Sequence, residues 1–401
     1  MPTPSHIAVV GASLAGLRAV ETLRRRGFDG RISVVGAEST LPYDRPPLSK
    51  EILQGKWEPE RTRLRDPASY EELDVDWRLG VRATGLDPDA RELELDGARK
   101  LGFDRLLIAT GASPRRLPGT PDLDGIHTLR TLDDALAIRA ALERGPRVVV
   151  VGAGFIGAEV AASCRERGID VTMLEVLPVP LVRAIGPELG GWLAAQHRDR
   201  GVDLRCGVGV AGFEGTGRLE RVRLDDGTAI EADLAVVGIG VAPETDWLRD
   251  SGIELRDGIV CDASCATNIP GITAAGDVAR WHNPLFSTEM RLEHWTNAVE
   301  QGAAAALRLL SEDHEAAPFR PVPFFWSDQY ELKLQMVGYV SGEDELRIVQ
   351  GSLEEGRFLA LYGREGRLTG AFGLNRARQV MQQRTRIAEG ISFDEAVAEL
   401  S

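Results

Sequence analysis

The sequence predicts an α/β fold made of two similar domains on parallel sheets, followed by an α+β domain. Two observations support this prediction. A strand, a glycine turn, a helix and a second strand follow one another twice in the chain, and segments that alternate apolar and polar residues replace this pattern after Pro318. At 401 residues, the chain also exceeds what one hydrophobic core usually organises.

The first copy of the pattern begins with the apolar run His6–Val10, which is typical of a buried parallel strand. A glycine turn leads into a predicted helix from Ala15 to about Arg26, and Gly27 closes this helix. The next predicted strand is Ile32–Val35. Together these segments have the length of one βαβ unit.

The second copy contains the strand Arg147–Val151, a helix through about Arg167 and the strand Val171–Leu174. It lies too far from the first copy for a solenoid repeat, so one nucleotide-binding domain interrupted by another explains the spacing better. Further strand-like runs are Arg105–Ala109, Leu234–Ile239 and Gly271–Ala275.

The C-terminal segment has a different character. Pro318, Pro321 and Pro323 mark a boundary, after which antiparallel strands are expected at Leu332–Met336, Leu346–Val349 and Phe358–Tyr362. Helical patterns close the chain, with Asn375 and Ser392 as predicted N-caps.

The second glycine turn carries the complete G-x-G-x-x-G signature in Gly152, Gly154 and Gly157, with Ile156 before the last glycine. Glu175 ends the following strand, where it can bind the ribose hydroxyls of a dinucleotide. A carboxylate there would repel a 2′-phosphate by about 4 kcal/mol at 4 Å and an effective dielectric near 20. We therefore expect NADH rather than NADPH, an inference that the nearby Arg183 weakens without reversing.

The first glycine turn is less complete. Gly11 and Gly16 can form the tight turn and the close helix packing that a pyrophosphate site needs, but Ser13 stands where the middle glycine is usual. Leu14 and Ala15 complete this turn, and Glu38 follows the next strand at the position of a ribose ligand. The alternative is an ordinary strand–helix turn with a surface acid.

Six other residues belong to the predicted cofactor sites. Thr110 and Gly111 follow a strand, as do Gly276 and Asp277, and Gly240 ends a further strand loop. Glu159 lies in the first turn of the second predicted helix, where it either interacts with the helix dipole or faces the nicotinamide.

In their order along the chain, these motifs resemble the flavoprotein disulfide reductase superfamily, in which the aspartate of a Gly-Asp pair binds the ribityl chain of FAD. The resemblance covers essentially the whole chain and implies two Rossmann-like dinucleotide-binding domains, for FAD and NAD. We expect residues 1–115 and 245–317 to bind FAD, residues 116–244 to bind NAD, and residues 318–401 to form the C-terminal α+β domain.

A narrower resemblance rests on the segments Leu41–Lys50, Leu292–Asn297 and Phe325–Gln329. They are similar to bacterial ferredoxin reductases of the putidaredoxin reductase and biphenyl dioxygenase reductase type. The resemblance implies catalytic or cofactor-binding roles for seven residues. Around the flavin, Lys50 and Arg45 would lie near the ring system, Arg130 would contact FAD, and Trp295 and Trp326 would lie near the isoalloxazine. Around the dinucleotide, Glu159 would lie near the nicotinamide and Glu175 would bind the adenosine ribose. The alternatives are core packing for the tryptophans and a solvated surface position for Lys50. Ala37 stands where the family often has an acid, so Glu38 need not bind the ribose.

The cysteines do not support a thiol mechanism. Cys164, Cys206, Cys261 and Cys265 form no Cys-x-x-Cys pair and no zinc pattern, so we expect buried free thiols and no metal. The first predicted helix lacks the cysteine pair of the disulfide reductases, and Leu41–Tyr43 replaces the single cysteine of the peroxide-reducing relatives. Electrons are therefore expected to leave the flavin without a thiol relay.

The resemblance implies an NADH:ferredoxin reductase whose [2Fe–2S] ferredoxin serves a haem monooxygenase or an aromatic-ring dioxygenase. The alternatives are a rubredoxin or monodehydroascorbate reductase, a redox-sensing protein of the apoptosis-inducing-factor type, or a nucleotide-binding module without turnover.

The net charge of −14 disfavours nucleic acid as a partner, and no apolar run is long enough to span a membrane. Because the start does not read as a signal peptide, we expect a cytoplasmic protein. An acidic ferredoxin then requires a local basic patch, and we expect that some of the following residues form it over the flavin: Arg291, Arg320, Lys333, Arg376 and Arg378.

Overall fold

A computed structural model describes residues 4–311 and 316–400. The chain forms two compact units, each assembled from separate segments. Unit 1 comprises Met1–Asp44, Arg63–Ser113 and Ala242–Phe324, and unit 2 comprises Arg45–Thr62, Pro114–Val241 and Phe325–Ser401. The three-domain boundaries drawn from the sequence stay a prediction.

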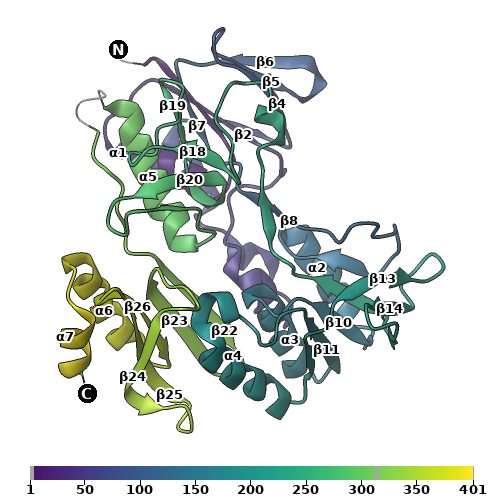
Figure 1. The fold of residues 1–401 in the computed structure, drawn as a ribbon. Coiled ribbons are helices and arrows are strands. Elements are labelled where there is room, and N and C mark those ends of the chain that lie inside the picture. Colours follow the sequence, from purple (N-terminus) through teal and green to yellow (C-terminus); the bar gives the residue numbers. More distant parts are fainter. Residues whose placement is uncertain (1–3, 312–315, 401) are drawn as a thin grey trace. The chain divides into compact units, whose positions relative to one another are not determined.

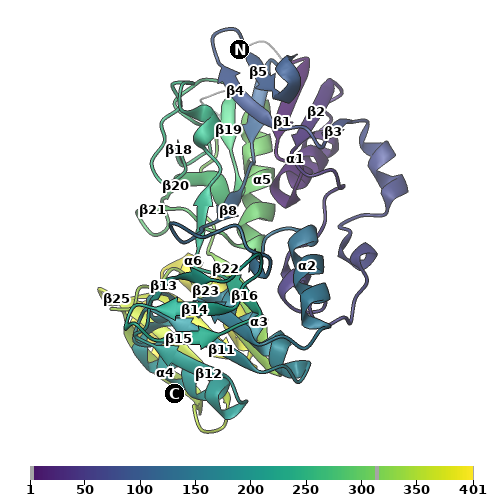
Figure 2. The same cartoon turned by 90° about the vertical axis from the view of Figure 1, so that its right-hand side faces the viewer.

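A parallel five-stranded sheet forms the centre of unit 1 (Figure 1). Its strands, in spatial order, are β19 (Ile272–Ala274), β7 (Arg105–Ile108), β1 (His6–Val10), β2 (Arg31–Gly36) and β3 (Asp76–Leu79). The predicted strands of the first copy are confirmed. The helices α1 (Leu14–Arg25) and α5 (Trp295–Leu310) pack against each other beside this sheet, as Figure 2 shows.

The apolar runs explain why this sheet forms. Ile7 and Val9 of the central strand β1 are fully buried, and they share a core with Leu17 and Leu23 of α1. Smaller sheets complete unit 1: one joins β4 (Ala83–Asp87), β5 (Glu92–Leu95) and β6 (Arg99–Gly102), and another joins β18 (Ile259–Cys261), β20 (Ala279–Asn283) and β21 (Thr288–Met290). The short strands β8 (Ala112–Pro114) and β17 (Val241–Pro243) pair with each other.

Unit 2 contains a second parallel five-stranded sheet, which confirms the predicted repeat of the βαβ plan. Its strands, in spatial order, are β12 (Asp203–Cys206), β11 (Val171–Glu175), β10 (Val148–Val151), β16 (Leu234–Val237) and β9 (Ile126–Thr128). The helices of this part are α2 (Leu132–Leu142), α3 (Phe155–Glu166) and α4 (Val182–Asp199). A small antiparallel sheet joins β13 (Val210–Glu214), β14 (Arg221–Leu224) and β15 (Ala229–Glu231).

The C-terminal part of unit 2 is a five-stranded sheet with antiparallel pairing, as predicted. Its strands, in spatial order, are β22 (Phe324–Gln329), β23 (Leu332–Gly338), β26 (Arg367–Leu374), β25 (Arg357–Arg364) and β24 (Glu345–Ser352), and the helices α6 (Ala377–Glu389) and α7 (Phe393–Ala398) follow. One face of α4 (Ile185, Leu189 and Leu193) is buried in the same core as Phe358 and Phe372 of this sheet.

One of the two predicted N-caps is wrong. Asn375 lies before the cap position in the left-handed region (φ 53°), and its Oδ1 accepts from the backbone N–H of Lys333 instead. The cap residue of α6 is Arg376. Ser392 is confirmed, because its hydroxyl accepts from the backbone N–H of Glu395 at the start of α7.

Among the residues that the structure describes, none of the helices has the length and apolar character required to cross a membrane.

Candidate functional site

The first glycine turn of unit 1 joins β1 to α1 in a conformation that only glycine tolerates at Gly11. The φ of Gly11 is +120°, and a Cβ there would lie 2.0 Å from the carbonyl oxygen of Ala109. A Cβ on Gly16 would lie 2.0 Å from the carbonyl oxygen of Gly11, so Gly16 lets α1 approach the turn. Ser13 is the N-cap residue of α1, yet its side chain makes no capping hydrogen bond. The Ser13 side chain therefore leaves the amides at this helix start available to an anion such as a phosphate.

Other predicted FAD residues gather around this turn. Gly276 (φ +77°) lies beside Ala15, since a Cβ on Gly276 would come within 3.2 Å of the Ala15 methyl carbon. The backbone N–H of Gly276 donates to Gln301 Oε1 at 2.9 Å, and Asp277 follows in a short 3-10 turn. A Cβ on Gly11 would also lie 3.0 Å from the backbone nitrogen of Thr110. The structure thus brings three separate sequence motifs to one place.

The remaining predicted residues of unit 1 lie around the same sheet. Glu38 follows β2 and accepts a hydrogen bond from the Tyr43 hydroxyl. Thr110 Oγ1 donates to the carbonyl of Glu244, and Gly111 has a φ of +74°. Trp295 begins α5, and its indole Nε1 donates to Asp44 Oδ1 at 2.7 Å. The hydrogen bond to Asp44, which sequence reasoning missed, fixes the ring orientation of Trp295.

The second glycine turn lies in unit 2 between β10 and α3. Gly152 has a φ of +98°, and a Cβ on Gly157 would lie 2.0 Å from the carbonyl oxygen of Gly152. A Cβ on Gly154, by contrast, would meet no atom within 4 Å. Gly152 and Gly157 are thus required by the packing of the turn, whereas Gly154 keeps open the space above the helix start.

The carboxylate of Glu175 is held against this turn. Its Oε2 accepts from the backbone N–H of Ala153 at 2.8 Å, and its Oε1 accepts from that of Leu177 at 2.9 Å. Ile156 is 47 % exposed at the start of α3. Arg183 is exposed in the first turn of α4, and Gly240 (φ +91°) follows β16. The roles of these residues toward a cofactor stay predictions.

A buried ion pair joins the two predicted catalytic residues, both of which lie in unit 2. Lys50 Nζ donates to Glu159 Oε2 at 2.9 Å, and the Ser49 hydroxyl donates to the same oxygen. Ser327 Oγ donates to the other oxygen, Glu159 Oε1, at 2.7 Å. The side chains of Lys50 and Glu159 are only 10 % and 4 % exposed, so Lys50 is not a solvated surface lysine. These donors, rather than the amides of the helix start, hold the carboxylate.

The segment 45–62 brings Lys50 to α3. Its 3-10 turn Pro46–Ser49, in which prolines preset the backbone, packs against α2 and α3. Ser163 of α3 donates to the backbone carbonyl of Ser49 at 2.7 Å. Arg45 Nη1 donates to the carbonyl of Arg130 at 2.6 Å, so these two predicted FAD residues are neighbours.

A series of hydrogen bonds leads from Glu159 through polar residues that the sequence analysis did not single out. Gln329 Nε2 contacts Ser327 Oγ at 3.1 Å, and Gln329 Oε1 contacts His197 Nε2 at 3.1 Å. His197 Nδ1 lies 3.0 Å from the Tyr330 hydroxyl. Ser327, Gln329 and His197 are fully buried. Trp326 lies next to Ser327 on β22 and is half-buried.

Burial of His197 makes stability dependent on pH. Burial lowers the pKa of His197 from 6.5 to about 4, so between these values the unfolded chain binds a proton that the folded chain excludes. The stabilisation is complete above pH 6.5 and is lost on acidification, by up to about 1.4 kcal/mol per pH unit. We expect His197→Gln to reduce this slope in denaturant titrations between pH 7 and 5, and the exposed control His282→Gln to leave it unchanged. Equal slopes in all three proteins would contradict this assignment.

The cysteines have the properties of structural thiols. Cys164, Cys261 and Cys265 are buried and free, as expected, and burial raises the pKa of Cys164 and Cys261 to about 12. Burial also raises the pKa of Cys265 well above its ordinary value. The expectation of burial is wrong for Cys206, which is partly exposed because it ends the edge strand β12. Thiols with raised pKa values are poor nucleophiles at neutral pH.

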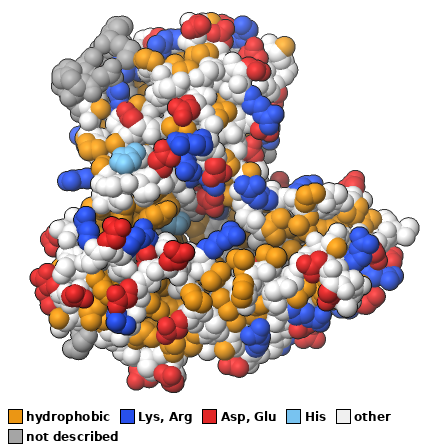
Figure 3. Space-filling view, viewed as in Figure 1, with side chains coloured by type: hydrophobic (Ala, Val, Ile, Leu, Met, Phe, Trp, Pro, Cys, Tyr) orange, Lys and Arg blue, Asp and Glu red, His pale blue; other side chains and the backbone are white. Residues whose placement is uncertain are grey.

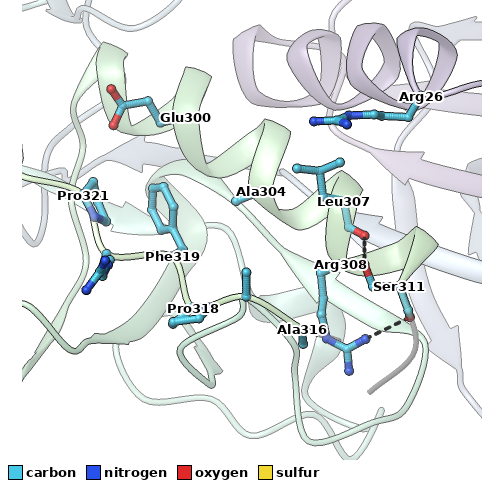
Figure 4. A pocket seen from close by; sticks show the side chains of 12 residues that line it. Arg26, Glu300, Ala304, Leu307, Arg308, Ser311, Ala316, Pro318, Phe319 and Pro321 are labelled. Atoms are coloured by element: carbon cyan, nitrogen blue, oxygen red, sulfur yellow. Dashed lines mark hydrogen bonds between the residues drawn. The ribbon is translucent and has the colours of Figure 1, made fainter. Parts of the chain in front are cut away.

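Unit 1 also contains a pocket of about 610 Å³ (Figure 4). It is lined by Arg26 of the α1 end, by residues of α5 and Ser311, and by residues of the segment 316–321. Arg308, one of the lining residues, donates hydrogen bonds to the hydroxyl of Ser264 and the carbonyl of Ser311. None of the predicted cofactor residues lines this pocket.

Two glycine turns, each between a strand of a parallel sheet and the start of a helix, are typical of a protein that binds two dinucleotides. The family model described as pyridine nucleotide-disulphide oxidoreductase matches residues 5–302, and the model described as reductase C-terminal matches residues 324–399. The chain belongs to this pyridine nucleotide-disulphide oxidoreductase family. The predicted fold class, the enzyme class of flavoprotein oxidoreductase, and the cofactors FAD and NADH are thereby confirmed.

Individual relatives agree with the narrower resemblance. The chain is 35% identical to the putidaredoxin reductase of Pseudomonas putida over 99% of this chain and 96% of the relative. It is 39% identical to the biphenyl dioxygenase system ferredoxin–NAD(+) reductase component of Paraburkholderia xenovorans, over 88% and 86% of the two chains. A solved covalent putidaredoxin reductase–putidaredoxin complex superimposes with a TM-score of 0.92 at 34% identity, covering 97% of this chain and 94% of that one.

The residues of unit 1 fit an FAD. The turn formed by Gly11 and Gly16 leaves amides at the start of α1 for a pyrophosphate. Beside Gly276, Asn297 donates from Nδ2 to Gln301, while its Oδ1 is buried without a hydrogen-bond partner. A buried acceptor of this kind is costly unless a ligand or water donates to it. Asn297 and Gln301 were missed in the sequence, although their spacing places both on one face of α5.

Proposed function

We propose that this protein is an NADH:ferredoxin reductase that binds FAD on unit 1 and NADH on unit 2. Two observations together carry the proposal. The Lys50–Glu159 ion pair is buried, and burial raises the pKa values of the Cys164 and Cys261 thiols, so that these thiols are poor electron-relay groups. When bound, FAD would supply the chemistry that links a two-electron donor such as NADH to acceptors of single electrons. An acceptor that takes single electrons, such as a [2Fe–2S] ferredoxin, fits this chemistry. The relatives named above are a putidaredoxin reductase and the ferredoxin–NAD(+) reductase component of a biphenyl dioxygenase system.

The protein supplies placement and electrostatics. Gly154 leaves room for the pyrophosphate of NADH, and Glu175 lies at the end of β11, where its negative charge disfavours a 2′-phosphate. Lys50 and Glu159 hold each other in fixed positions, which is a requirement for orienting a nicotinamide.

We further propose that the ferredoxin serves a haem monooxygenase or an aromatic-ring dioxygenase. The free thiols favour a cytoplasmic location.

Reduction of cytochrome c tests this function. The purified protein should carry a flavin spectrum and reduce cytochrome c with NADH only after a [2Fe–2S] ferredoxin is added. A redox sensor would instead form a long-lived flavin–NAD complex with slow reoxidation. A colourless protein would contradict the proposal, and equal rates with and without ferredoxin would contradict ferredoxin as the acceptor.

We also propose that an acidic ferredoxin docks at a basic surface formed by Lys333, Arg376 and Arg378. The backbone N–H of Lys333 donates to the side-chain Oδ1 of Asn375, which places Lys333 beside the start of α6. This helix has no acid in its first turn, where positive side chains oppose the helix dipole. Such an arrangement favours an anionic partner. On the face shown in Figure 3, charges of both signs are interspersed, so the net charge does not prevent local attraction.

Two of the five predicted cations lie outside this basic surface. Arg291 is wrong as a docking residue, because its side chain is only 11 % exposed and pairs with Asp257 and Glu293. Arg320 is exposed in unit 1 and stays a separate prediction.

Charge reversal tests the basic surface. We expect Lys333→Glu with Arg378→Glu to raise the ferredoxin concentration for half-maximal rate about fivefold at low salt, and less at high salt. The matched control reverses Arg347 and Arg357, which are also exposed on the C-terminal sheet. NADH oxidation with an artificial acceptor should stay unchanged in both proteins. Equal effects of the two charge reversals would contradict a specific docking surface.

A further inference from the structure

The contacts of Glu159 in unit 2 form a directed chain of hydrogen bonds. Glu159 Oε1 can only accept as a carboxylate, so the single hydroxyl proton of Ser327 is used in the 2.7 Å contact to it. Ser327 Oγ must then accept from Gln329 Nε2. This fixes the amide orientation of Gln329, whose Oε1 can only accept from His197. His197 therefore carries its proton on Nε2.

The last link has the same direction. With a proton on Nε2, the Nδ1 of neutral His197 is an acceptor, so the Tyr330 hydroxyl donates to it at 3.0 Å. Each donor in the chain thus points toward Glu159, from Tyr330 through His197, Gln329 and Ser327. Hydrogen bonds aligned in this way polarise one another and strengthen the last one, here onto a carboxylate.

The distal end of the chain is fixed to α4. Arg200 forms an ion pair with Glu331, and its guanidinium lies 4.9 Å from the centre of the Tyr330 ring. Tyr330 occupies the left-handed region (φ 57°) between β22 and β23, a conformation that a bulky residue holds only when its surroundings enforce it. The α4 end, the turn at Tyr330 and Glu159 of α3 are therefore linked through buried side chains.

We propose that Ser327 is a positioning residue for Glu159, and that Gln329 and His197 set the direction of its hydroxyl. Lys50 and Ser49 hold Oε2 of the carboxylate, and Ser327 holds Oε1, so the plane of the carboxylate is fixed relative to the Lys50 ammonium. This inference rests on the proposed function, in which the Lys50–Glu159 pair orients the nicotinamide. Its consequence is a rate of flavin reduction that depends on Ser327, Gln329 and His197.

The tautomer of His197 tests the chain without any turnover. Nuclear magnetic resonance of ¹⁵N-labelled histidine, assigned with His197→Gln, should show the Nε2–H tautomer of a neutral ring. A proton on Nδ1, or a charged ring at neutral pH, would overturn the proposed direction. This readout is independent of whether the protein proves to be a ferredoxin reductase.

Rapid mixing with NADH tests the positioning. We expect Ser327→Ala to lower the limiting rate of flavin reduction about tenfold, equivalent to about 1.4 kcal/mol, with little change in NADH affinity. Ser327→Thr, which keeps the hydroxyl, should restore most of the rate. The control Ser251→Ala removes another buried serine hydroxyl, which donates to the carbonyl of Leu248 in unit 1, and should leave the rate unchanged. A Ser327→Ala protein with the unchanged rate, or with only the NADH affinity weakened, would overturn the positioning role.

Discussion

Lys50→Met should lower the free energy of unfolding by about 3–5 kcal/mol, because it leaves the Glu159 carboxylate buried without its countercharge. The pair is almost entirely removed from solvent, with exposed fractions of 10 % and 4 %. Methionine fills a similar volume, so the loss is electrostatic rather than a packing defect. Denaturant titration of the two proteins measures the difference.

The chain provides a matched control for this experiment. Lys56 and Glu166 form an ion pair of the same 2.9 Å length between the same segment and the same helix α3, but Lys56 is 60 % exposed. We expect Lys56→Met to change the stability by less than about 1 kcal/mol. The double variant Lys50→Met with Glu159→Gln should recover part of the stability, because no charge is left buried, but none of the NADH-dependent flavin reduction. If the Lys50→Met protein were as stable as the Lys56→Met protein, the free energy of unfolding would not depend on the charge of the buried pair, which would contradict this account.

Gly154→Ala should leave the fold intact and weaken NADH binding by about a hundredfold, or about 2.8 kcal/mol. A Cβ at this position would touch no atom of the protein within 4 Å, and the φ of −71° suits alanine. The new methyl would instead occupy the space that a pyrophosphate needs for close approach to the start of α3. Equilibrium titration with NADH, together with thermal unfolding, separates these effects.

Gly191→Ala is the control for this variant. Gly191 lies within α4, and its Cβ would also meet no atom within 4 Å. Alanine in a helix stabilises by about 0.5–1 kcal/mol, with no expected effect on NADH. If Gly154→Ala bound NADH as tightly as the Gly191→Ala protein, the second glycine turn would not be the dinucleotide site.

The sequence predicted those parts of the fold that depend on local patterns. The four-valine run that became β10 and the glycines at 152 and 157 allow few other arrangements, because a side chain at Gly157 would overlap the carbonyl of Gly152. The small boundary errors, such as a first helix that begins at Leu14 instead of Ala15, reflect end geometry that residue patterns do not determine.

Long-range contacts could not be read from the sequence in the same way. The Lys50–Glu159 pair joins residues 109 positions apart, and nothing in the local sequence of either residue indicated that they meet. Two local signals could have pointed to their partners. Ser327 and Gln329 are polar at alternate, buried positions of one strand, and His197 continues the apolar series Ile185, Leu189 and Leu193 at a spacing of four. Polar residues on a buried face require partners, which makes them candidates for a network.

Anaerobic single-turnover mixing tests the central claim most directly. NADH should reduce the bound FAD faster than NADPH does, and the reduced protein should then reduce two equivalents of a [2Fe–2S] ferredoxin for each NADH, as the electron count requires. Alkylation of accessible thiols beforehand should change neither step, because the cysteines take no part in the transfer. Faster reduction by NADPH, or a loss of ferredoxin reduction after alkylation, would contradict an NADH- and flavin-based route to ferredoxin.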